Sequence, residues 1–180
     1  MKHIEVNIWK ACNNKCRFCM SSQYAIKKVG ETYWLVDYEL IKKEIERYSL
    51  KWYNSIWYIW WDISIHPQIY DIISYSKINW FEQINIITNW MIFSDFKKAE
   101  KIIQLWVNRV NISIHSHINI IEDFLTQVNW WLQKKLKAID NFNLLYNRWL
   151  LKTPISINIV INGLNYKDIL KTCIFFNRNK

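Results

Sequence analysis

Strand-like and helix-like segments alternate along the whole chain, and this alternation limits the folds that are open to it. Five short segments rich in isoleucine and valine predict strands, at residues 4–8, 55–59, 84–88, 109–115 and 155–161. Apolar residues spaced three and four apart predict the intervening helices, at residues 37–48, 68–77, from about 95, 132–146 and from about 166. Ser94 is the expected N-cap of the third helix. Five strand–helix units predict an α/β fold with a parallel sheet and right-handed crossovers.

Length and charge narrow the class of protein further. With 180 residues, 51% of them hydrophobic, the chain is expected to form one domain with a sizeable core. No apolar run is long enough to span a bilayer and no secretory segment is found, so we expect no membrane partner and a cytoplasmic location. The net charge of +9 is compatible with nucleic acid or an acidic partner. However, lysine pairs such as Lys42-Lys43, Lys97-Lys98 and Lys134-Lys135 are spread along helices, where solvated helix faces explain them equally well.

Three cysteines lie close together near the N-terminus, in the segment Cys12-Asn13-Asn14-Lys15-Cys16-Arg17-Phe18-Cys19. The spacing C-x3-C-x2-C lets three thiolates hold three irons of a [4Fe–4S] cluster and leave the fourth iron open, whereas closed clusters normally use four cysteines. A structural zinc site is the alternative, but it usually pairs two C-x2-C segments, and Cys173 is isolated. The spacing therefore favours a cluster whose open iron can bind a substrate or cosubstrate.

This segment resembles the signature of the radical S-adenosylmethionine (radical SAM) superfamily, which is CxxxCxxC with an aromatic residue before the last cysteine. Two other segments are similar to motifs of that family: residues 60–67, which look like its GGEPxxHP segment, and Thr88-Asn89-Trp90, which looks like its TNG turn. The resemblance covers nearly the whole chain. It implies a partial (β/α) TIM-like barrel of six units, of which about five are present. Residues 1–180 would then be a radical SAM core domain that is incomplete at its C-terminus.

The resemblance also implies which residues bind the cofactors. Cys12, Cys16 and Cys19 would hold the [4Fe–4S] cluster, and S-adenosylmethionine (SAM) would bind at the open iron. Phe18 would pack near the adenine, and the segment from Trp60 through Trp61 to Asp62 would lie near the methionine end, with Asp62 in place of the family's glutamate. The other cofactor-binding residues implied by the resemblance are Asn89, Ser113 and Asn158. The structural alternatives are an N-cap or loop carboxylate for Asp62, a turn residue for Asn89 and a hydrogen-bonded amide for Asn158.

Polar residues share one face of the fourth predicted strand. Asn111, Ser113 and His115 alternate with apolar residues, so their side chains are expected on the same side. A polar face on a buried parallel strand is unusual unless it lines a site. His115 and His117 are candidates for proton donors or extra ligands, although hydrogen-bonded scaffolding is the commoner role of histidines at the start of a loop.

Tryptophan is unusually frequent and glycine unusually rare. The chain has 12 Trp and 2 Gly, whereas average glycine usage of about 7% predicts roughly 12 or 13 glycines. Several tryptophans stand where glycine is common: Trp90 follows Thr88-Asn89 at a strand end, and Trp80 and Trp149 lie between a helix and the next strand. We therefore hypothesise that most of these tryptophans are glycines in the living protein, because some bacterial lineages read UGA as glycine. The alternative is a genuinely tryptophan-rich protein.

The function implied by the resemblance is that of a radical SAM enzyme. A reduced [4Fe–4S] cluster would cleave SAM to methionine and a 5′-deoxyadenosyl radical, which would abstract hydrogen from a small-molecule, peptide or RNA substrate. Flavodoxin or ferredoxin would be the electron donor. Two other classes are open at this point: a non-catalytic module that carries a cluster or zinc and binds RNA, and a degenerate radical SAM fold that has lost its cosubstrate.

Overall fold

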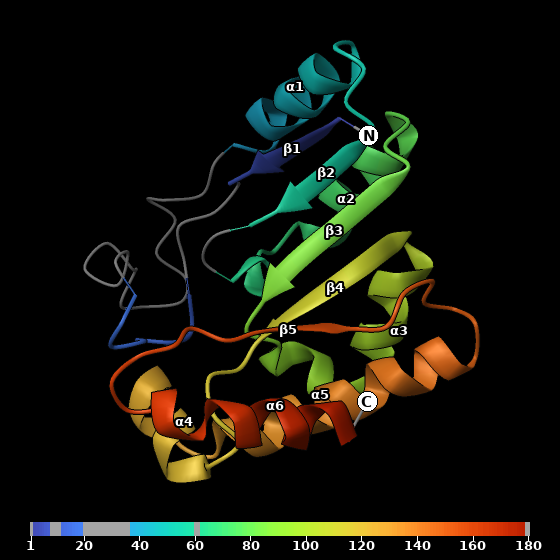
Figure 1. The fold of residues 1–180 in the computed structure, drawn as a ribbon. Helices are drawn as coiled ribbons and strands as arrows, with labels where there is room; N and C mark the ends of the chain where they lie inside the picture. The colour runs from blue at the N-terminus through green and yellow to red at the C-terminus, as the bar shows by residue number, and fades with distance from the viewer. Residues whose placement is uncertain (1, 8–11, 20–36, 60–61, 179–180) are drawn as a thin grey trace.

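The computed structural model describes residues 2–7, 12–19, 37–59 and 62–178, and these form a parallel α/β fold (Figure 1). The sheet has five strands in the order β1-β2-β3-β4-β5, and every neighbouring pair is parallel. The strands are β1 (His3–Val6), β2 (Ser55–Tyr58), β3 (Gln83–Thr88), β4 (Val107–Ser113) and β5 (Ser156–Asn158). Each strand lies beside the one before it in the sequence, so the sheet is an open part of a barrel, as the alternating pattern predicts.

Helices separate the strands. The α-helices are α1 (Tyr38–Ser49), α2 (Ile69–Ile78), α3 (Phe96–Gln104), α4 (Asn119–Thr126), α5 (Trp131–Asn147) and α6 (Ile169–Arg178). The described residues also form short 3₁₀ turns, namely η3 (Ile63–Ile65), η4 (Met91–Ser94) and η5 (Tyr166–Asp168). Among the described residues, no helix is long and apolar enough to cross a membrane.

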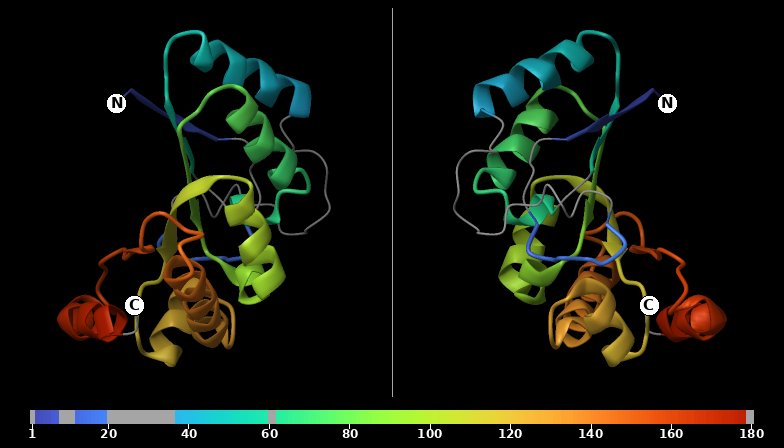
Figure 2. Two further views of the ribbon diagram at one scale, coloured as in Figure 1. Left: turned by 90° about the vertical axis from the view of Figure 1, so that its right-hand side faces the viewer. Right: turned by 90° about the vertical axis from the view of Figure 1, so that its left-hand side faces the viewer.

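The core lies between one face of the sheet and the helices that cover it. Figure 2 shows α1, α2 and α3 stacked along this face. Alternate strand residues point to it and are fully buried, because a strand side chain changes face at every residue. These core residues include Ile56, Tyr58, Ile84, Ile86, Val110 and Ile112. The opposite face of the same strands carries Trp57, Asn85, Arg109, Asn111 and Ser113, so the expected polar face of the fourth strand extends across to its neighbours.

The fourth and fifth units differ from the predicted boundaries. β4 ends at Ser113, two residues earlier than expected, and the chain then forms α4, which the spacing of apolar residues did not predict. β5 is limited to Ser156–Asn158, although isoleucine recurs at every second residue as far as residue 161. The physical reason is loss of the partner strand: the Ile114 amide donates to the Asn158 carbonyl at 3.0 Å, and beyond that point β4 has turned away.

Helix capping corrects one sequence prediction. Ser94 is the last residue of η4 and does not cap α3. Asp95 is the N-cap, and its carboxylate accepts hydrogen bonds from the amides of Lys97 and Lys98. An aspartate at this position also interacts favourably with the positive end of the helix dipole, which a serine does less well. Asp37 caps α1 in the same way through the amide of Glu39.

Most of the described tryptophans have a backbone conformation that favours glycine. Six of the eight described tryptophans have positive φ, namely Trp52, Trp80, Trp90, Trp106, Trp130 and Trp149, with values from 60° to 76°. Gln127 is the other described non-glycine residue in this region. A left-handed conformation costs an L-residue roughly 1–2 kcal/mol, and bulky side chains rarely adopt it. This concentration supports the hypothesis that glycine occupies these positions in the living protein.

Three of these tryptophans form a complete helix C-terminal motif. The Trp80 amide donates to the Lys77 carbonyl at 3.1 Å, and the next amide, that of Phe81, donates to the Ser76 carbonyl at 3.2 Å. The same pair of bonds follows α1 at Trp52 and α5 at Trp149. This is the Schellman motif, whose left-handed residue is usually glycine. These three side chains are 86–91% exposed, so packing does not explain why tryptophan stands there.

Candidate functional site

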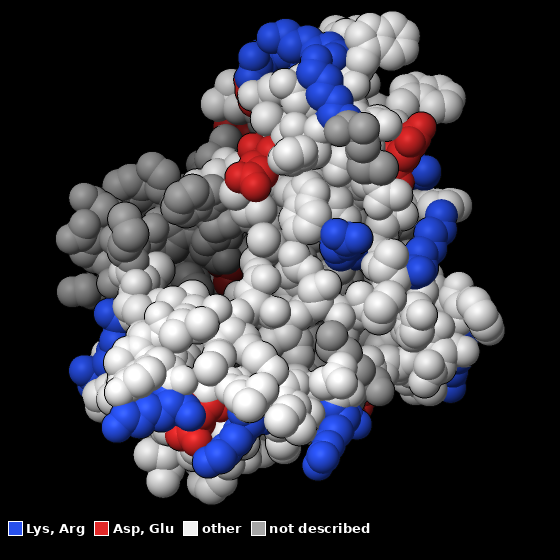
Figure 3. Space-filling model, viewed as in Figure 1, with Lys and Arg blue, Asp and Glu red and all other residues white. Residues whose placement is uncertain are grey.

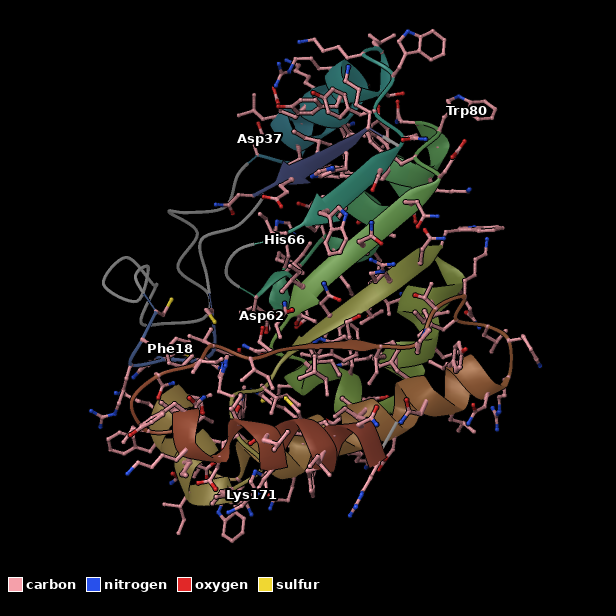
Figure 4. All side chains as sticks on the ribbon, viewed as in Figure 1. Phe18, Asp37, Asp62, His66, Trp80 and Lys171 are labelled. Atoms are coloured by element: carbon pink, nitrogen blue, oxygen red, sulfur yellow. The ribbon has the colours of Figure 1, made fainter. Side chains whose placement is uncertain are left out.

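The three-cysteine loop lies at the carboxyl ends of the strands, where α4 holds it. The amides of Lys15 and Arg17 donate to the carbonyls of Thr126 and Leu125, at 3.1 and 2.9 Å. The Arg17 guanidinium donates to the Phe124 carbonyl at 3.1 Å and lies 3.9 Å over the centre of the Phe124 ring. The last carbonyls of a helix lack partners within the helix, so they are available to fix a passing chain. Figure 4 places Phe18 at this edge of the sheet, on the same side as Asp62.

The three thiols of the loop are half-buried and receive few hydrogen bonds. The Cys12 Sγ accepts from the Asn14 amide at 3.4 Å and from the Asn89 side chain at 3.6 Å. Burial raises the pKa of the Cys12 thiol to about 12, and the nearby Asp62 carboxylate adds to that rise. Burial also raises the pKa of Cys16. Metal coordination requires thiolates, so a bound metal would provide the positive charge that these buried sulfurs lack.

Three thiols on one loop are the donor set of an iron–sulfur cluster with an open iron. Within residues 2–7, 12–19, 37–59 and 62–178, no group of three or more His, Cys, Asp or Glu side chains is placed to hold a single metal ion. A structural zinc ion needs four donors at about 2.0–2.3 Å from one centre. A [4Fe–4S] cluster instead takes each sulfur on a different iron, so its three cysteines need only surround a larger group.

Asp62 is fully buried beside the loop. Its Oδ1 accepts from the Ser64 amide at 3.1 Å, from the Ser64 hydroxyl at 2.7 Å and from the Thr88 hydroxyl, which makes it the N-cap of η3. Burial raises its pKa. Its second oxygen, Oδ2, is buried with no hydrogen-bond partner among the described residues. A buried carboxylate oxygen without a hydrogen bond lowers the stability of the fold, unless a ligand donates a hydrogen bond to it.

Asn89 and Phe18 lie against the same loop. The Asn89 side chain donates to Cys12 Sγ and to the Asn13 side chain, so it links the end of β3 to the cysteines. The Phe18 ring meets the His115 ring edge-on, with 4.5 Å between centroids. These contacts bring together four elements: the cysteine loop, η3, the end of β3 and the end of β4.

The two candidates on the last strands are neighbours. Ser113 and Asn158 are paired in register across β4 and β5, and both are half-buried. Asn111 lies one pleat earlier on the same face as Ser113, and its Oδ1 is buried without a hydrogen-bond partner in the described part of the chain. Trp60 and Trp61 lie outside the described residues, so their place near a cosubstrate stays a prediction from the resemblance.

The two histidines after β4 have different surroundings. His115 is buried; its Nδ1 accepts from the Val160 amide at 3.2 Å, and its carbonyl accepts from the Asn165 side chain at 2.8 Å. The acceptor role of Nδ1 places the proton on Nε2. His117 instead bonds Thr172 at 2.9 Å and stacks on Phe175, which ties it to α6. Of the two, only His115 borders the cysteine loop.

Two residues of the site were not among the sequence candidates. Glu122 on α4 and Lys135 on α5 form a salt bridge of 2.6 Å with both side chains completely buried. The expectation that the Lys134-Lys135 pair lies on a solvated helix face is thus wrong for Lys135. The available signal was that Lys135 stands within an apolar stripe of the helix, between Leu132 and Ala138–Ile139 at helical spacing.

Burial of the histidines predicts how stability depends on pH. Burial first, and then the Lys135 charge, lowers the pKa of His115 to about 3, and burial lowers that of His66 to about 4. An unfolded histidine titrates near pH 6.5, so below that pH the unfolded chain binds protons that the folded chain does not. We expect stability to fall on acidification between pH 7 and 5, by about 1.5–2 kcal/mol for His115 alone.

Urea unfolding at pH 7 and pH 5 measures this effect. The variant His115→Asn keeps an acceptor for the Val160 amide but removes the titrating ring, so its loss of stability between the two pH values should be smaller than that of the parent. His3→Asn, at an exposed position of β1, is the control and should behave as the parent does. An equal pH dependence in the parent and in His115→Asn would contradict the prediction.

Comparison with known proteins places the chain in a family. Fold and site together define a parallel α/β partial barrel with a three-cysteine loop at the carboxyl ends of its strands. A family model described as "Radical SAM superfamily" matches residues 6–175. The chain therefore belongs to the radical SAM superfamily, whose members use a [4Fe–4S] cluster and SAM. A search of curated proteins finds no match.

Solved structures of similar fold agree with this placement. They include Streptococcus suis SuiB bound to S-adenosylmethionine, with a TM-score of 0.77 at 14% identity, covering 98% of this chain and 38% of that one. Native anSMEcpe with bound AdoMet has a TM-score of 0.74 at 14% identity, with coverage of 98% and 48%. Methylornithine synthase (PylB) has a TM-score of 0.70 at 11% identity, with coverage of 99% and 50%. The chain thus spans at most half the length of these structures. The predicted α/β partial-barrel fold is confirmed.

Proposed function

We propose that this chain is the catalytic core of a radical SAM enzyme, with Cys12, Cys16 and Cys19 as the ligands of a [4Fe–4S] cluster. The observation that carries the proposal is the position of the three-cysteine loop, which backbone hydrogen bonds fix beside the buried Asp62 and the polar ends of β3 and β4. When bound, the cluster and SAM supply one-electron cleavage of a carbon–sulfur bond, which gives methionine and a 5′-deoxyadenosyl radical. A low-potential donor such as flavodoxin or ferredoxin supplies the electron.

The residues around the loop have roles in binding and orientation. The orphan Oδ2 of Asp62 would accept a hydrogen bond from the amino group of SAM, while Oδ1 stays fixed by Ser64 and Thr88. The ring of Phe18, braced edge-on by His115, would pack against the adenine. Ser113 and Asn158, adjacent in register, would contact polar groups of the cosubstrate. The buried Asn111 amide on the same face supports a substrate that lies over the sheet.

Anaerobic reconstitution with iron and sulfide tests this proposal. The protein should show a [4Fe–4S] absorption spectrum and should form 5′-deoxyadenosine from SAM when dithionite is added. A colourless protein with tightly held zinc would identify a zinc module instead. A protein that keeps its cluster but does not cleave SAM would be a degenerate member of the family.

On the face that Figure 3 shows, the charges of the described residues give little support to the RNA-binding alternative. Figure 3 shows lysine and arginine side chains dispersed over the viewed face, with no continuous basic patch on it. Several of the cations are engaged by neighbours, as Lys42 is by Glu39 and Arg47 by Glu44, at 2.7 and 2.6 Å. Nucleic-acid affinity depends on many phosphate contacts acting together, which dispersed charges do not supply.

A further inference from the structure

A buried ion pair lies beneath the cysteine loop. Glu122 and Lys135 are each 0% exposed, and their charged groups are 2.6 Å apart. Burying two charges costs several kcal/mol per ion before their attraction is counted, and apolar replacements are often as stable. Such a pair is therefore expected to add little to the free energy of unfolding. The residues that its charged groups contact indicate another role.

Apart from the bond between them, the described hydrogen bonds of the two charged groups all go to the backbone at the carboxyl end of β4. The second oxygen of Glu122 accepts from the amides of His115 and Ser116, at 2.8 and 2.9 Å. The Lys135 ammonium donates to the Ser113 carbonyl at 2.7 Å. The pair thus fixes the backbone of residues 113–116. Because His115 belongs to this segment, the pair also helps to position its ring, which contacts the ring of Phe18.

The pair also fixes the support of the cysteine loop. Glu122 belongs to α4, and the carbonyls of the last turn of α4 hold Lys15 and Arg17. Because Lys135 joins α4 to α5, a shift of this pair would move both the cysteine loop and the end of β4. The two cofactor-facing segments, about 100 residues apart in the sequence, share one anchor.

The positive charge of Lys135 lies behind the support of the cysteine loop. Lys135 pairs with Glu122 of α4, and carbonyls at the end of that helix hold the amides of Lys15 and Arg17, on either side of Cys16. The same ammonium lowers the pKa of the nearby Asp62 carboxyl against the effect of burial. Lys135 is thus a completely buried cation that is joined to the helix supporting the loop.

We propose that Glu122 and Lys135 are positioning residues of the cysteine site, which hold the loop against the end of β4 and make the cluster easier to reduce. This inference rests on the proposed function for the second of these roles. A reduced cluster carries one more negative charge than an oxidised one, so a buried cation nearby stabilises the reduced form. Removing the cation lowers the midpoint potential, and removing only the carboxylate raises it.

Two variants separate these roles. Glu122→Gln with Lys135→Met removes both charges at nearly constant volume, and Glu122→Gln alone keeps the cation. The matched control is Asp168→Asn with Lys171→Met, which neutralises the solvent-exposed pair on η5 and α6 that Figure 4 marks at Lys171. Because a neutral pair of similar size packs well, the double variant at Glu122 and Lys135 should fold even if Glu122→Gln does not.

The first readout needs no cofactor. Amide hydrogen exchange of the cluster-free protein should show protection at His115 and Ser116 lowered at least tenfold in the double variant, and unchanged in the control. The second readout is the midpoint potential of the reconstituted cluster, from a redox titration followed by electron paramagnetic resonance. The potential should be less negative in Glu122→Gln than in the parent, and it should become more negative again from Glu122→Gln to the double variant, the step that removes the cation alone.

The outcomes are distinguishable. Unchanged exchange at His115 and Ser116 would overturn the positioning role, whether or not a cluster forms. Changed exchange with a potential that does not become more negative from Glu122→Gln to the double variant would overturn the electrostatic role. Failure of the parent protein to bind a cluster at all would contradict the proposed function while the exchange result still decides the positioning role.

Discussion

Alanine at any one of Cys12, Cys16 and Cys19 will prevent stable iron incorporation and abolish 5′-deoxyadenosine formation. Each sulfur is expected to hold one iron, so a single replacement leaves two protein ligands for a cluster that already has one open iron. Loss of a residue that merely orients a metal ligand typically lowers metal affinity or activity 10–100-fold. Loss of the ligand itself should therefore lower the affinity for the cluster by more than about tenfold. Iron content per protein after anaerobic reconstitution and desalting measures the effect.

The matched control is Cys173→Ala. Cys173 is exposed on α6. Its replacement by alanine should leave the iron content of the protein unchanged. Iron loss in that variant would identify a fourth protein ligand and would argue against an open iron. Full iron content in Cys12→Ala, Cys16→Ala or Cys19→Ala would refute the assignment of the three-cysteine loop.

Glycine at Trp52, Trp80 and Trp149 will stabilise a protein made with the standard genetic code by about 1 kcal/mol per site. Relief of a left-handed backbone gains roughly 1–2 kcal/mol, and the greater freedom of glycine in the unfolded chain takes back part of it. The three side chains are 86–91% exposed, so little packing is lost. The sites lie after three different helices, so the triple variant should gain about 3 kcal/mol.

Urea unfolding of the single and triple variants gives these free energies. Trp57→Gly is the matched control, because Trp57 lies in β2 with an ordinary strand conformation and faces Arg109. Glycine in a strand lowers stability by roughly 0.5–1 kcal/mol, so the sign of the effect should reverse there. A loss of stability at Trp52, Trp80 and Trp149 would remove the physical basis of the glycine hypothesis.

Peptide masses of the protein isolated from its source organism test the hypothesis itself. Glycine masses at these three positions are expected if the organism reads UGA as glycine. Tryptophan masses would mean that the chain tolerates left-handed tryptophans, and the coding hypothesis would then be wrong.

The order of elements could be predicted from the sequence because hydrophobic periodicity is a local property. The apolar spacing in residues 38–48 and the alternation around Ile112 each reflect which face packs on the core, and the parallel topology follows from their order. The ends of the strands depend on pairing with residues that are far away in the sequence, so they could not be predicted in the same way. β5 stops at Asn158 because β4 turns away, and no pattern within residues 155–161 carries that information.

The residues of the site likewise divide into those that a local motif predicts and those that depend on distant parts of the chain. The cysteine spacing is a local motif, so Cys12, Cys16 and Cys19 could be found directly. Asp62 and Asn89 could be found only through the resemblance to a family, since alone they are an ordinary cap and an ordinary turn residue. Glu122 and Lys135 were missed because charged residues on amphipathic helices are usually solvated, and only the packing of α4 on α5 buries them.

The hydrogen bonds from the cysteine loop to the end of α4 affect the order in which the protein is built. Lys15 and Arg17 leave the ribosome long before Leu125 and Thr126, and synthesis proceeds at roughly 5–20 residues per second. Contacts between residues so far apart in sequence form late, because a long loop must close first. The loop therefore lacks these hydrogen bonds to α4 until the fourth unit has emerged and packed. Cofactor insertion is then expected to follow synthesis, and the nascent thiols are exposed to oxidation until it occurs.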